Sequence, residues 1–225
     1  MTEIKICGIT SLEDAMAVAE AGADAMGFIF YPASPRFVTP ERAGQITRGI
    51  KSPIVKVGVF VNQDPREVEE IMRYCRLDMI QLHGDESPGY CGRFRADSVI
   101  KALSGWAEGD TEPWLTYKVR AFLLDAKAPS LYGGTGRKAD WGLARELGRR
   151  HPLILSGGLN AANVCEAIAA VSPAAVDFNS GVELSPGRKD HEKVGEVVRL
   201  VRSMGHRDQG RVFAAVGGTH DREDA

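Results

Sequence analysis

The stretch that decides the fold is "IKICGITSLEDAMAVAEAGADAMGFIF", residues 4–30. It begins with a short apolar run that predicts a strand over residues 4–9. Ser11 then stands as a candidate N-cap, apolar residues follow at helical spacing, and Gly22 ends the pattern. A second apolar run predicts a strand over residues 25–30. This order of strand, helix and strand is typical of parallel strands joined by a crossover helix.

The same unit recurs along the chain. Apolar runs predict eight short strands, at residues 4–9, 25–30, 55–61, 79–83, 99–103, 121–126, 153–158 and 174–179. Amphipathic stretches separate most of them; the weakest helix prediction is for residues 105–119. Eight such units predict a closed (β/α)8 barrel, and an open doubly wound sheet is the alternative. No G-x-G-x-x-G turn follows the first strand, which argues against a dinucleotide-binding version of that alternative.

Composition narrows the class of protein. Of the 225 residues, 44% are hydrophobic and 26% are charged, with a formal net charge of −2 and no basic stripe, so nucleic acid is not expected as a partner. No apolar run approaches the length of a membrane span, and no signal-peptide pattern begins the sequence. The cysteines at 7, 75, 91 and 165 form no C-x-x-C pair. We therefore expect a cytoplasmic protein with free thiols and neither a zinc site nor a disulfide framework.

The domain prediction is one barrel over residues 1–204, because no linker rich in Pro, Gly or Ser interrupts the repeat. Residues 205–225 have lost the repeat and are polar and Gly-rich. We expect this tail to be mobile, to bury little apolar surface and to be dispensable for stability.

Chemistry in a (β/α)8 barrel gathers at the C-terminal ends of the strands. Side chains alternate across a strand, so Lys5 and Cys7 share the face that points into the barrel. A buried Lys5 would need an anionic partner, either a carboxylate from a neighbouring strand or an anionic substrate. A lone strand cysteine is more often a small buried hydrophobe than a catalytic group, so Cys7 is judged by its surroundings.

Other polar side chains share this position at strand ends. Asp125 ends the sixth strand on the same face as Leu123, and Asp177 lies on the inward face of the eighth. Gln81 and His83 share a face of the fourth strand. Asp125 read by itself fits a turn residue as well as a catalytic acid. His83 read by itself fits a structural hydrogen-bonding role better than catalysis.

Glycine-rich loops follow the seventh and eighth strands, "SGGLN" at 156–160 and "NSGVE" at 179–183. Backbone N–H groups on such loops suit a phosphate, and these two positions are a frequent phosphate site in (β/α)8 barrels. A third loop, "YGGTG" at 132–136 with Gly134 at its centre, suggests a cover or a further anion contact. Arg36, in "YPASPRFV" after the second strand, offers a fork for a carboxylate, although a surface arginine is the simpler interpretation.

Eight motifs taken in order resemble the phosphoribosylanthranilate isomerase family of tryptophan biosynthesis. They are "KICGIT", "SPRFV", "VGVFVN", "QLHGDE", "LLDA", "YGGTG", "LSGGLN" and "VDFNSGVE", and the resemblance covers residues 1 to about 203. It implies a (β/α)8 isomerase that carries out an Amadori rearrangement of a phosphorylated small molecule. It further implies that no cofactor or metal is required, and that the enzyme is a monomer or a homodimer.

The resemblance also implies residue roles. Cys7 is expected to be the general base and Asp125 the general acid, with Lys5 enlarging the thiolate fraction of Cys7. The remaining substrate contacts would be Arg36 on the anthranilate carboxylate, Asp177 on a hydroxyl, and Gly157, Gly158, Ser180 and Gly181 on the phosphate.

Three rival functions stay open at this stage. A ribulose-phosphate epimerase-like barrel would use a metal held by His and Asp. An indole-glycerol-phosphate synthase-like barrel would use a lysine acid, for which Lys101 is the candidate. A phosphosugar-binding protein without catalysis would have no use for the pair Cys7 and Asp125.

Overall fold

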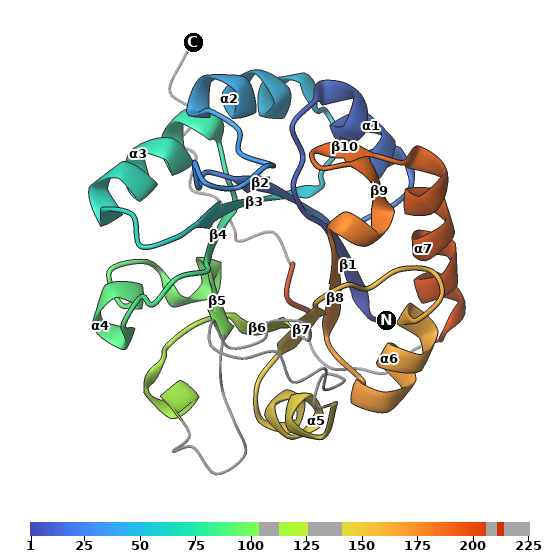
Figure 1. Ribbon diagram of the computed structural model, residues 1–225. Helices are drawn as coiled ribbons and strands as arrows, with labels where there is room; N and C mark the ends of the chain where they lie inside the picture. The colour runs from blue at the N-terminus through green and yellow to red at the C-terminus, as the bar shows by residue number, and fades with distance from the viewer. Residues whose placement is uncertain (104–112, 126–140, 206–210, 214–225) are drawn as a thin grey trace.

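A computed structural model describes residues 1–103, 113–125, 141–205 and 211–213. Eight parallel strands close into a barrel in chain order, with β8 paired to β1 (Figure 1). The strands are β1 Glu3–Ile6, β2 Ala25–Ile29, β3 Val55–Phe60, β4 Met79–Leu82, β5 Val99–Leu103, β6 Ala121–Asp125, β7 Leu153–Ser156 and β8 Ala175–Phe178. The predicted (β/α)8 fold is confirmed, and the open-sheet alternative is wrong because the sheet closes on itself.

Helices surround the barrel on the outside (Figure 1). They are α1 Leu12–Glu20, α2 Pro40–Gly49, α3 Pro65–Cys75, α4 Pro88–Cys91, α5 Trp141–Arg150, α6 Val164–Val171 and α7 His191–Ser203. A short antiparallel hairpin, β9 Glu183–Ser185 and β10 Arg188–Lys189, follows β8. The expected helix over residues 105–119 is reduced, in its described part, to a 3-10 turn at Pro113–Thr116.

Local sequence signals explain where the helices begin. The Ser11 hydroxyl accepts a hydrogen bond of 3.1 Å from the N–H of Asp14, as expected of an N-cap. Asp64 caps α3 in the same way, and Pro65 occupies the first helical position, where its missing N–H costs nothing. Gly22 follows the end of α1 at a φ of +86°, a left-handed conformation that favours glycine.

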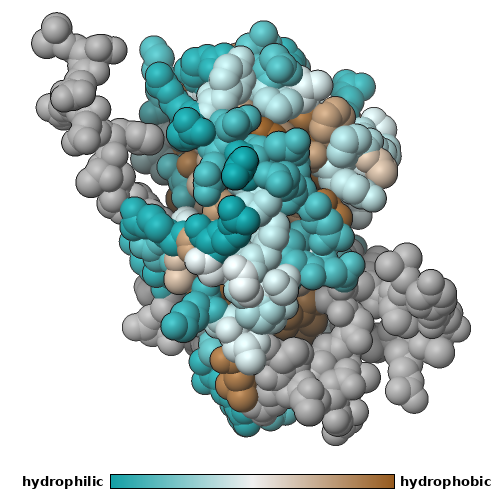
Figure 2. Space-filling model, turned by 90° about the vertical axis from the view of Figure 1, so that its left-hand side faces the viewer, coloured by the Kyte–Doolittle hydropathy of each residue, from teal (hydrophilic) through white to brown (hydrophobic). Residues whose placement is uncertain are grey.

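Alternation along the strands produces two packed layers. Inward-facing residues such as Val57 and Leu123 fill the barrel, and outward-facing residues such as Ile4 and Phe28 pack under the helices. The outer surface is polar by contrast: the face that carries α3 is mainly hydrophilic, with apolar residues only in small separate patches (Figure 2). Within the described residues, no helix has the length and apolar character needed to cross a bilayer.

The tail departs from its predicted behaviour at residues 211–213. This segment enters the ring of strands (Figure 1), and Val212 and Phe213 are buried among inward-facing residues from the N-terminal ends of the strands, Ala25 and Val55 among them. The carboxylate of Glu3 accepts hydrogen bonds from the N–H groups of both residues. The expectation that the tail buries little is therefore wrong for these residues, because their apolar side chains fill the mouth of the barrel.

Truncation tests this correction. A chain ending at residue 210 should lose about 2–5 kcal/mol of unfolding free energy relative to a chain ending at Phe213, because it leaves one Val and one Phe side chain unburied. The melting temperature should fall by roughly 5–15 °C, measured by circular dichroism. The chain ending at Phe213 is the matched control. Equal melting of the two chains would show that the segment contributes nothing to stability.

Candidate active site

A pocket of about 270 Å³ opens at the C-terminal ends of the strands. Nine of the residues expected in the site line it: Cys7, Arg36, Gln81, His83, Asp125, Gly157, Gly158, Asp177 and Ser180. Lys5 and Gly181 lie outside its lining, and Gly134, with the loop 132–136, lies outside the described residues. Lys101, the lysine of a rival function, does not line the pocket either; its Nζ lies 2.9 Å from the carboxylate of Glu86.

The floor of the pocket is built on a buried ion pair. Lys5 is fully buried, and its Nζ donates a hydrogen bond of 3.0 Å to the carboxylate of Asp177 on the neighbouring strand β8. The expectation that a neighbouring carboxylate would pair with Lys5 is confirmed. Burial alone would lower the pKa of Lys5, but the charges and hydrogen bonds around it, that of Asp177 first among them, outweigh burial and raise it. Lys5 therefore stays protonated beneath the pocket.

Cys7 lies just past the end of β1, packed against Ile29 and Val59. Its side chain points to the pocket, so the face predicted from strand alternation is correct. Burial raises the pKa of the thiol, and Lys5 and Lys189 lower it by a smaller amount, so the net shift is upward. Lys5 acts in the expected direction, since it lowers the thiol pKa, but burial has the larger effect because desolvating a thiolate costs more than the ammonium returns.

Two glycines make room around Cys7. A Cβ built on Gly27 of β2 would lie 2.8 Å from the Cys7 sulfur and 3.2 Å from Lys5 Nζ, so a larger residue would displace both. Gly8 has a φ of +77°, and a Cβ there would lie 2.8 Å from both the Arg36 side chain and the Asn179 side chain. The space beside Cys7 is thus taken by Arg36 and Asn179, which pack closely over the end of β1.

Asp125 ends β6 and is half-buried at the pocket wall. Since β6 is not a neighbour of β1 in the barrel, Asp125 and Cys7 approach the pocket from non-adjacent strands. A molecule bound in the pocket would lie between a carboxyl group and a thiol.

His83 and Gln81 line the pocket as a pair from the end of β4. Gln81 Nε2 lies 2.8 Å from His83 Nδ1, and with the amide as donor the ring carries its proton on Nε2. Burial, together with the charge of Lys5, lowers the pKa of His83, so the ring is neutral near pH 7. Gln81 Oε1 is buried without a hydrogen-bond partner among the described residues. A bound hydroxyl group would satisfy it.

The loops after β7 and β8 have the geometry expected of an anion site. Gly157 and Gly158 adopt φ values of +98° and +66°, which favour glycine. Among the described residues, none accepts a hydrogen bond from the main-chain N–H of Gly157, Gly158 or Ser180. Gly181 also packs closely: a Cβ there would overlap the backbone carbonyl of Leu159, so this glycine allows the two loops to touch. Its expected phosphate contact stays a prediction.

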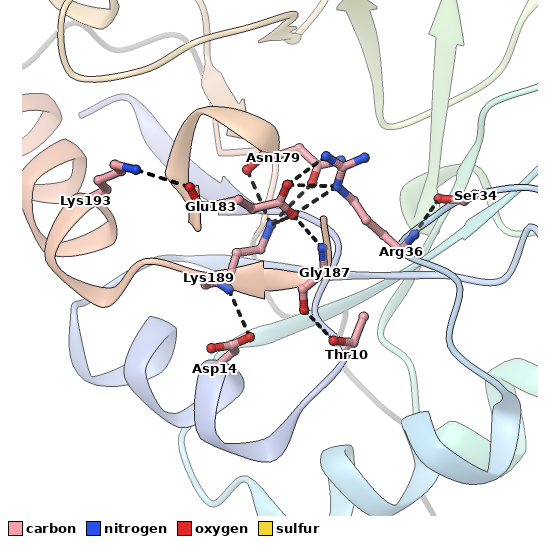
Figure 3. A network of polar contacts seen from close by, with 9 residues as sticks. All are labelled: Thr10, Asp14, Ser34, Arg36, Asn179, Glu183, Gly187, Lys189 and Lys193. Atoms are coloured by element: carbon pink, nitrogen blue, oxygen red, sulfur yellow. Dashed lines mark hydrogen bonds and ion pairs between the residues drawn. The ribbon is translucent and has the colours of Figure 1, made fainter. Parts of the chain in front are cut away.

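Arg36 reaches the pocket but is already bound to a carboxylate. Its Nε and Nη2 donate to Glu183 at 2.9 and 2.7 Å, and Lys189 Nζ lies 2.8 Å from the same carboxylate (Figure 3). Sequence reasoning gave no role to Glu183 or Lys189. Glu183 ends the motif "NSGVE", so its position beside the glycine-rich loop could have indicated a role in the site. No sequence pattern indicates a role for Lys189.

Comparisons with known proteins agree with this architecture. Fold and pocket place the chain among the (β/α)8-barrel enzymes that act at the C-terminal ends of their strands. A family model described as N-(5'phosphoribosyl)anthranilate (PRA) isomerase matches residues 4–200. The chain therefore belongs to the N-(5'-phosphoribosyl)anthranilate isomerase family.

Individual relatives cover nearly the whole chain. The N-(5'-phosphoribosyl)anthranilate isomerase of Syntrophus aciditrophicus is 52% identical over 202 residues, covering 90% of this chain and 88% of the relative. That of Geobacter sulfurreducens is 49% identical, covering 90% and 99%. The crystal structure of phosphoribosyl anthranilate isomerase from Thermotoga maritima matches with a TM-score of 0.81 at 44% identity, covering 90% of this chain and 100% of that one.

Gly27 provides a test of the site geometry. Gly27→Ala should lower turnover at least about tenfold, because the new methyl group displaces the Cys7 sulfur and a small misplacement is costly in catalysis. Gly58→Ala is the matched control: Gly58 lies in β3, and a Cβ there would lie 2.7 Å from the side chains of Leu77 and Phe60, on the helix-facing side. The control should lose stability and keep turnover. Equal turnover in the two variants would contradict the assigned position of Cys7.

The upward shift of the Cys7 pKa can be measured directly. The rate of Cys7 carbamidomethylation by iodoacetamide, followed by mass spectrometry of its peptide, should keep rising at pH values above about 9, where the rate for free cysteine levels off. The sign follows from burial, which favours the neutral thiol. A plateau below about pH 8 would show that Lys5 dominates over burial.

Proposed function

We propose that this pocket converts N-(5-phosphoribosyl)anthranilate into 1-(2-carboxyphenylamino)-1-deoxyribulose 5-phosphate in tryptophan biosynthesis. One observation carries the proposal: a thiol and a carboxyl group, Cys7 and Asp125, face one pocket whose rim holds a guanidinium and glycine-rich loops. Membership of the isomerase family supports this substrate. A related phosphoribosyl anthranilate isomerase has a crystal structure in complex with reduced 1-(o-carboxyphenylamino)-1-deoxyribulose 5-phosphate, a close analogue of the product.

The first chemical step opens the ribose ring. Asp125 gives its proton to the ring oxygen, the bond between that oxygen and C1 breaks, and the lone pair of the substrate nitrogen forms an iminium with C1. Without the proton, the ring oxygen would have to leave as an alkoxide. The proposed role of Asp125 is therefore to turn this oxygen into a hydroxyl leaving group.

The second step moves the hydrogen from C2. The iminium is an electron sink, so the thiolate of Cys7 can remove the C2 proton while the electron pair forms a C1–C2 double bond. Ketonisation of this enol-amine returns a proton to C1 and leaves the ketone at C2. Oxidation of C2 and reduction of C1 balance within the substrate, so the scheme calls for no external oxidant or reductant.

Other side chains would bind and orient the substrate. We assign the anthranilate carboxylate to Arg36, as a charge-assisted hydrogen-bonded pair. We assign the phosphate to the N–H groups of Gly157, Gly158 and Ser180, with Gly181 bringing the two loops together. Asp177, with Gln81 and His83, would hold the sugar hydroxyls. Lys5 would act from below: its ammonium lowers the pKa of Asp177 and of the Cys7 thiol, whereas burial raises both.

Cellular context follows from the same proposal. All four cysteines, Cys7, Cys75, Cys91 and Cys165, are free thiols, which suits a reducing compartment, and we place the enzyme in the cytoplasm. We propose a monomer or a homodimer. The Thermotoga maritima relative is described as dimeric, and monomers generated from it have a crystal structure, which supports either state.

Two substitutions separate the proposed acid from the proposed base. Cys7→Ser and Asp125→Asn should each fold normally and lose at least about 100-fold in turnover. With deuterium at the substrate C2, Cys7→Ser should show a primary isotope effect because proton abstraction limits its rate. Asp125→Asn should show none because ring opening limits it.

The loss of substrate fluorescence measures both rates. Cys165→Ser, a half-buried thiol on α6 outside the pocket, is the matched control and should keep full turnover. A well-folded Cys7→Ser enzyme with near-normal turnover would show that the thiol is not the base.

A further inference from the structure

The carboxylate of Glu183 binds one edge of the Arg36 guanidinium. Oε1 and Oε2 accept from Nε at 2.9 and 3.1 Å, and Oε2 also accepts from Nη2 at 2.7 Å. Arg36 comes from the loop after β2 and Glu183 from the start of β9, so the pair spans 147 positions of sequence. The fork-to-fork geometry fixes the plane as well as the position of the guanidinium.

A guanidinium has two edges that can each bind a carboxylate. Glu183 uses the edge formed by Nε and Nη2, and among the described residues none accepts from Nη1 on the other edge. Because the group is planar and rigid, holding one edge also aims the second edge. Arg36 lines the pocket, so the second edge is available to a ligand there.

Glu183 is itself held in place from the other side. Lys189 Nζ donates to Oε1 at 2.8 Å and the N–H of Gly187 donates to Oε1 at 3.2 Å (Figure 3). The Lys189 side chain is fully buried and also donates to Asn179 Oδ1 at 3.2 Å. The hairpin that carries Lys189 is held against α1 and the loop before it. The main-chain N–H of Lys189 donates to the carboxylate of Asp14, and the Thr10 hydroxyl donates to the carbonyl of Gly187.

Charge in this cluster favours an anionic ligand. Burial tends to raise the pKa of Glu183, but hydrogen bonds from Arg36 and Lys189 outweigh burial and lower it, so the group stays ionised. One carboxylate between two cations leaves a net positive charge beside the pocket. A second carboxylate at the open edge of Arg36 would neutralise that charge.

We propose that Glu183, supported by Lys189, is a positioning residue that aims the open edge of Arg36 at the carboxylate of the substrate. The inference rests on the proposed function, because it takes the anthranilate carboxylate as the ligand of Arg36. Glu183 makes the site selective for substrates that carry this carboxylate over those that lack it. It acts through Arg36 and does not touch the reacting atoms.

Ligand binding tests this role without turnover. The probes are reduced 1-(o-carboxyphenylamino)-1-deoxyribulose 5-phosphate and the same molecule without its carboxyl group, titrated by calorimetry. Glu183→Gln keeps the shape of the side chain and removes its charge. It should weaken binding of the carboxylated probe about tenfold, within the range for one charge-assisted pair, and leave binding of the other probe unchanged. In turnover, KM should rise and kcat should change little.

Further variants show whether Glu183 acts through Arg36. Arg36→Ala should weaken binding of the carboxylated probe at least as much as Glu183→Gln does. The double variant, Arg36→Ala with Glu183→Gln, should bind this probe no more weakly than Arg36→Ala alone. Glu86→Gln is the matched control, since Glu86 is a buried carboxylate paired with Lys101 at 2.9 Å outside the pocket. It should lose stability and keep full preference for the carboxylated probe. Glu183→Asp, which keeps the charge but shortens the reach, replaces Glu183→Gln if that variant does not fold.

Two results would overturn the inference alone, given an active wild-type enzyme that prefers the carboxylated probe: Glu183→Gln weakens binding of both probes equally, or it leaves binding of the carboxylated probe unchanged. A wild-type chain that binds both probes equally would overturn the proposed function of Arg36 and this inference with it.

Discussion

The ion pair between Lys5 and Asp177 connects the closure of the barrel with its chemistry. It joins β1 to β8, the two strands at which the ring closes, and both side chains are buried. Removing either partner would leave an uncompensated buried charge, at a cost of about 3–5 kcal/mol. The same ammonium lies under Cys7, where it lowers the pKa of the thiol while burial raises it. Fold stability and the ionisation of the proposed base therefore depend on one contact.

Much of this arrangement could be predicted from the sequence. A period of two along each strand decides which side chains face inward, and parallel strands bring their C-terminal ends to one rim. That reasoning placed Lys5, Cys7 and Asp125 inside or above the barrel, and it required an anionic partner for Lys5. Glycine-rich loops predicted an anion site because their signal is local, and this site stays a prediction. The roles of individual residues came from the family resemblance and remain proposals.

Other features were outside the reach of such patterns. The contact between Arg36 and Glu183 joins positions 147 residues apart, and no local signal specifies such a pair. The net pKa shift of Cys7 depends on how much solvent the fold removes, and this balance cannot be read from the presence of Lys5. The tail lacks a periodic apolar face, yet two adjacent residues, Val212 and Phe213, suffice to fill the mouth of the barrel.

The bond between Glu3 and the segment 211–213 also has a consequence for biosynthesis. Glu3 precedes Val212 by 209 positions, so a ribosome makes this carboxylate long before the N–H groups that it binds. Domains begin to fold from the N-terminal side during translation. A nascent barrel therefore lacks this cover at the N-terminal ends of its strands, and Glu3 lacks these two donors, until residues 211–213 have been made. The closing of this mouth comes after the synthesis of all eight strands.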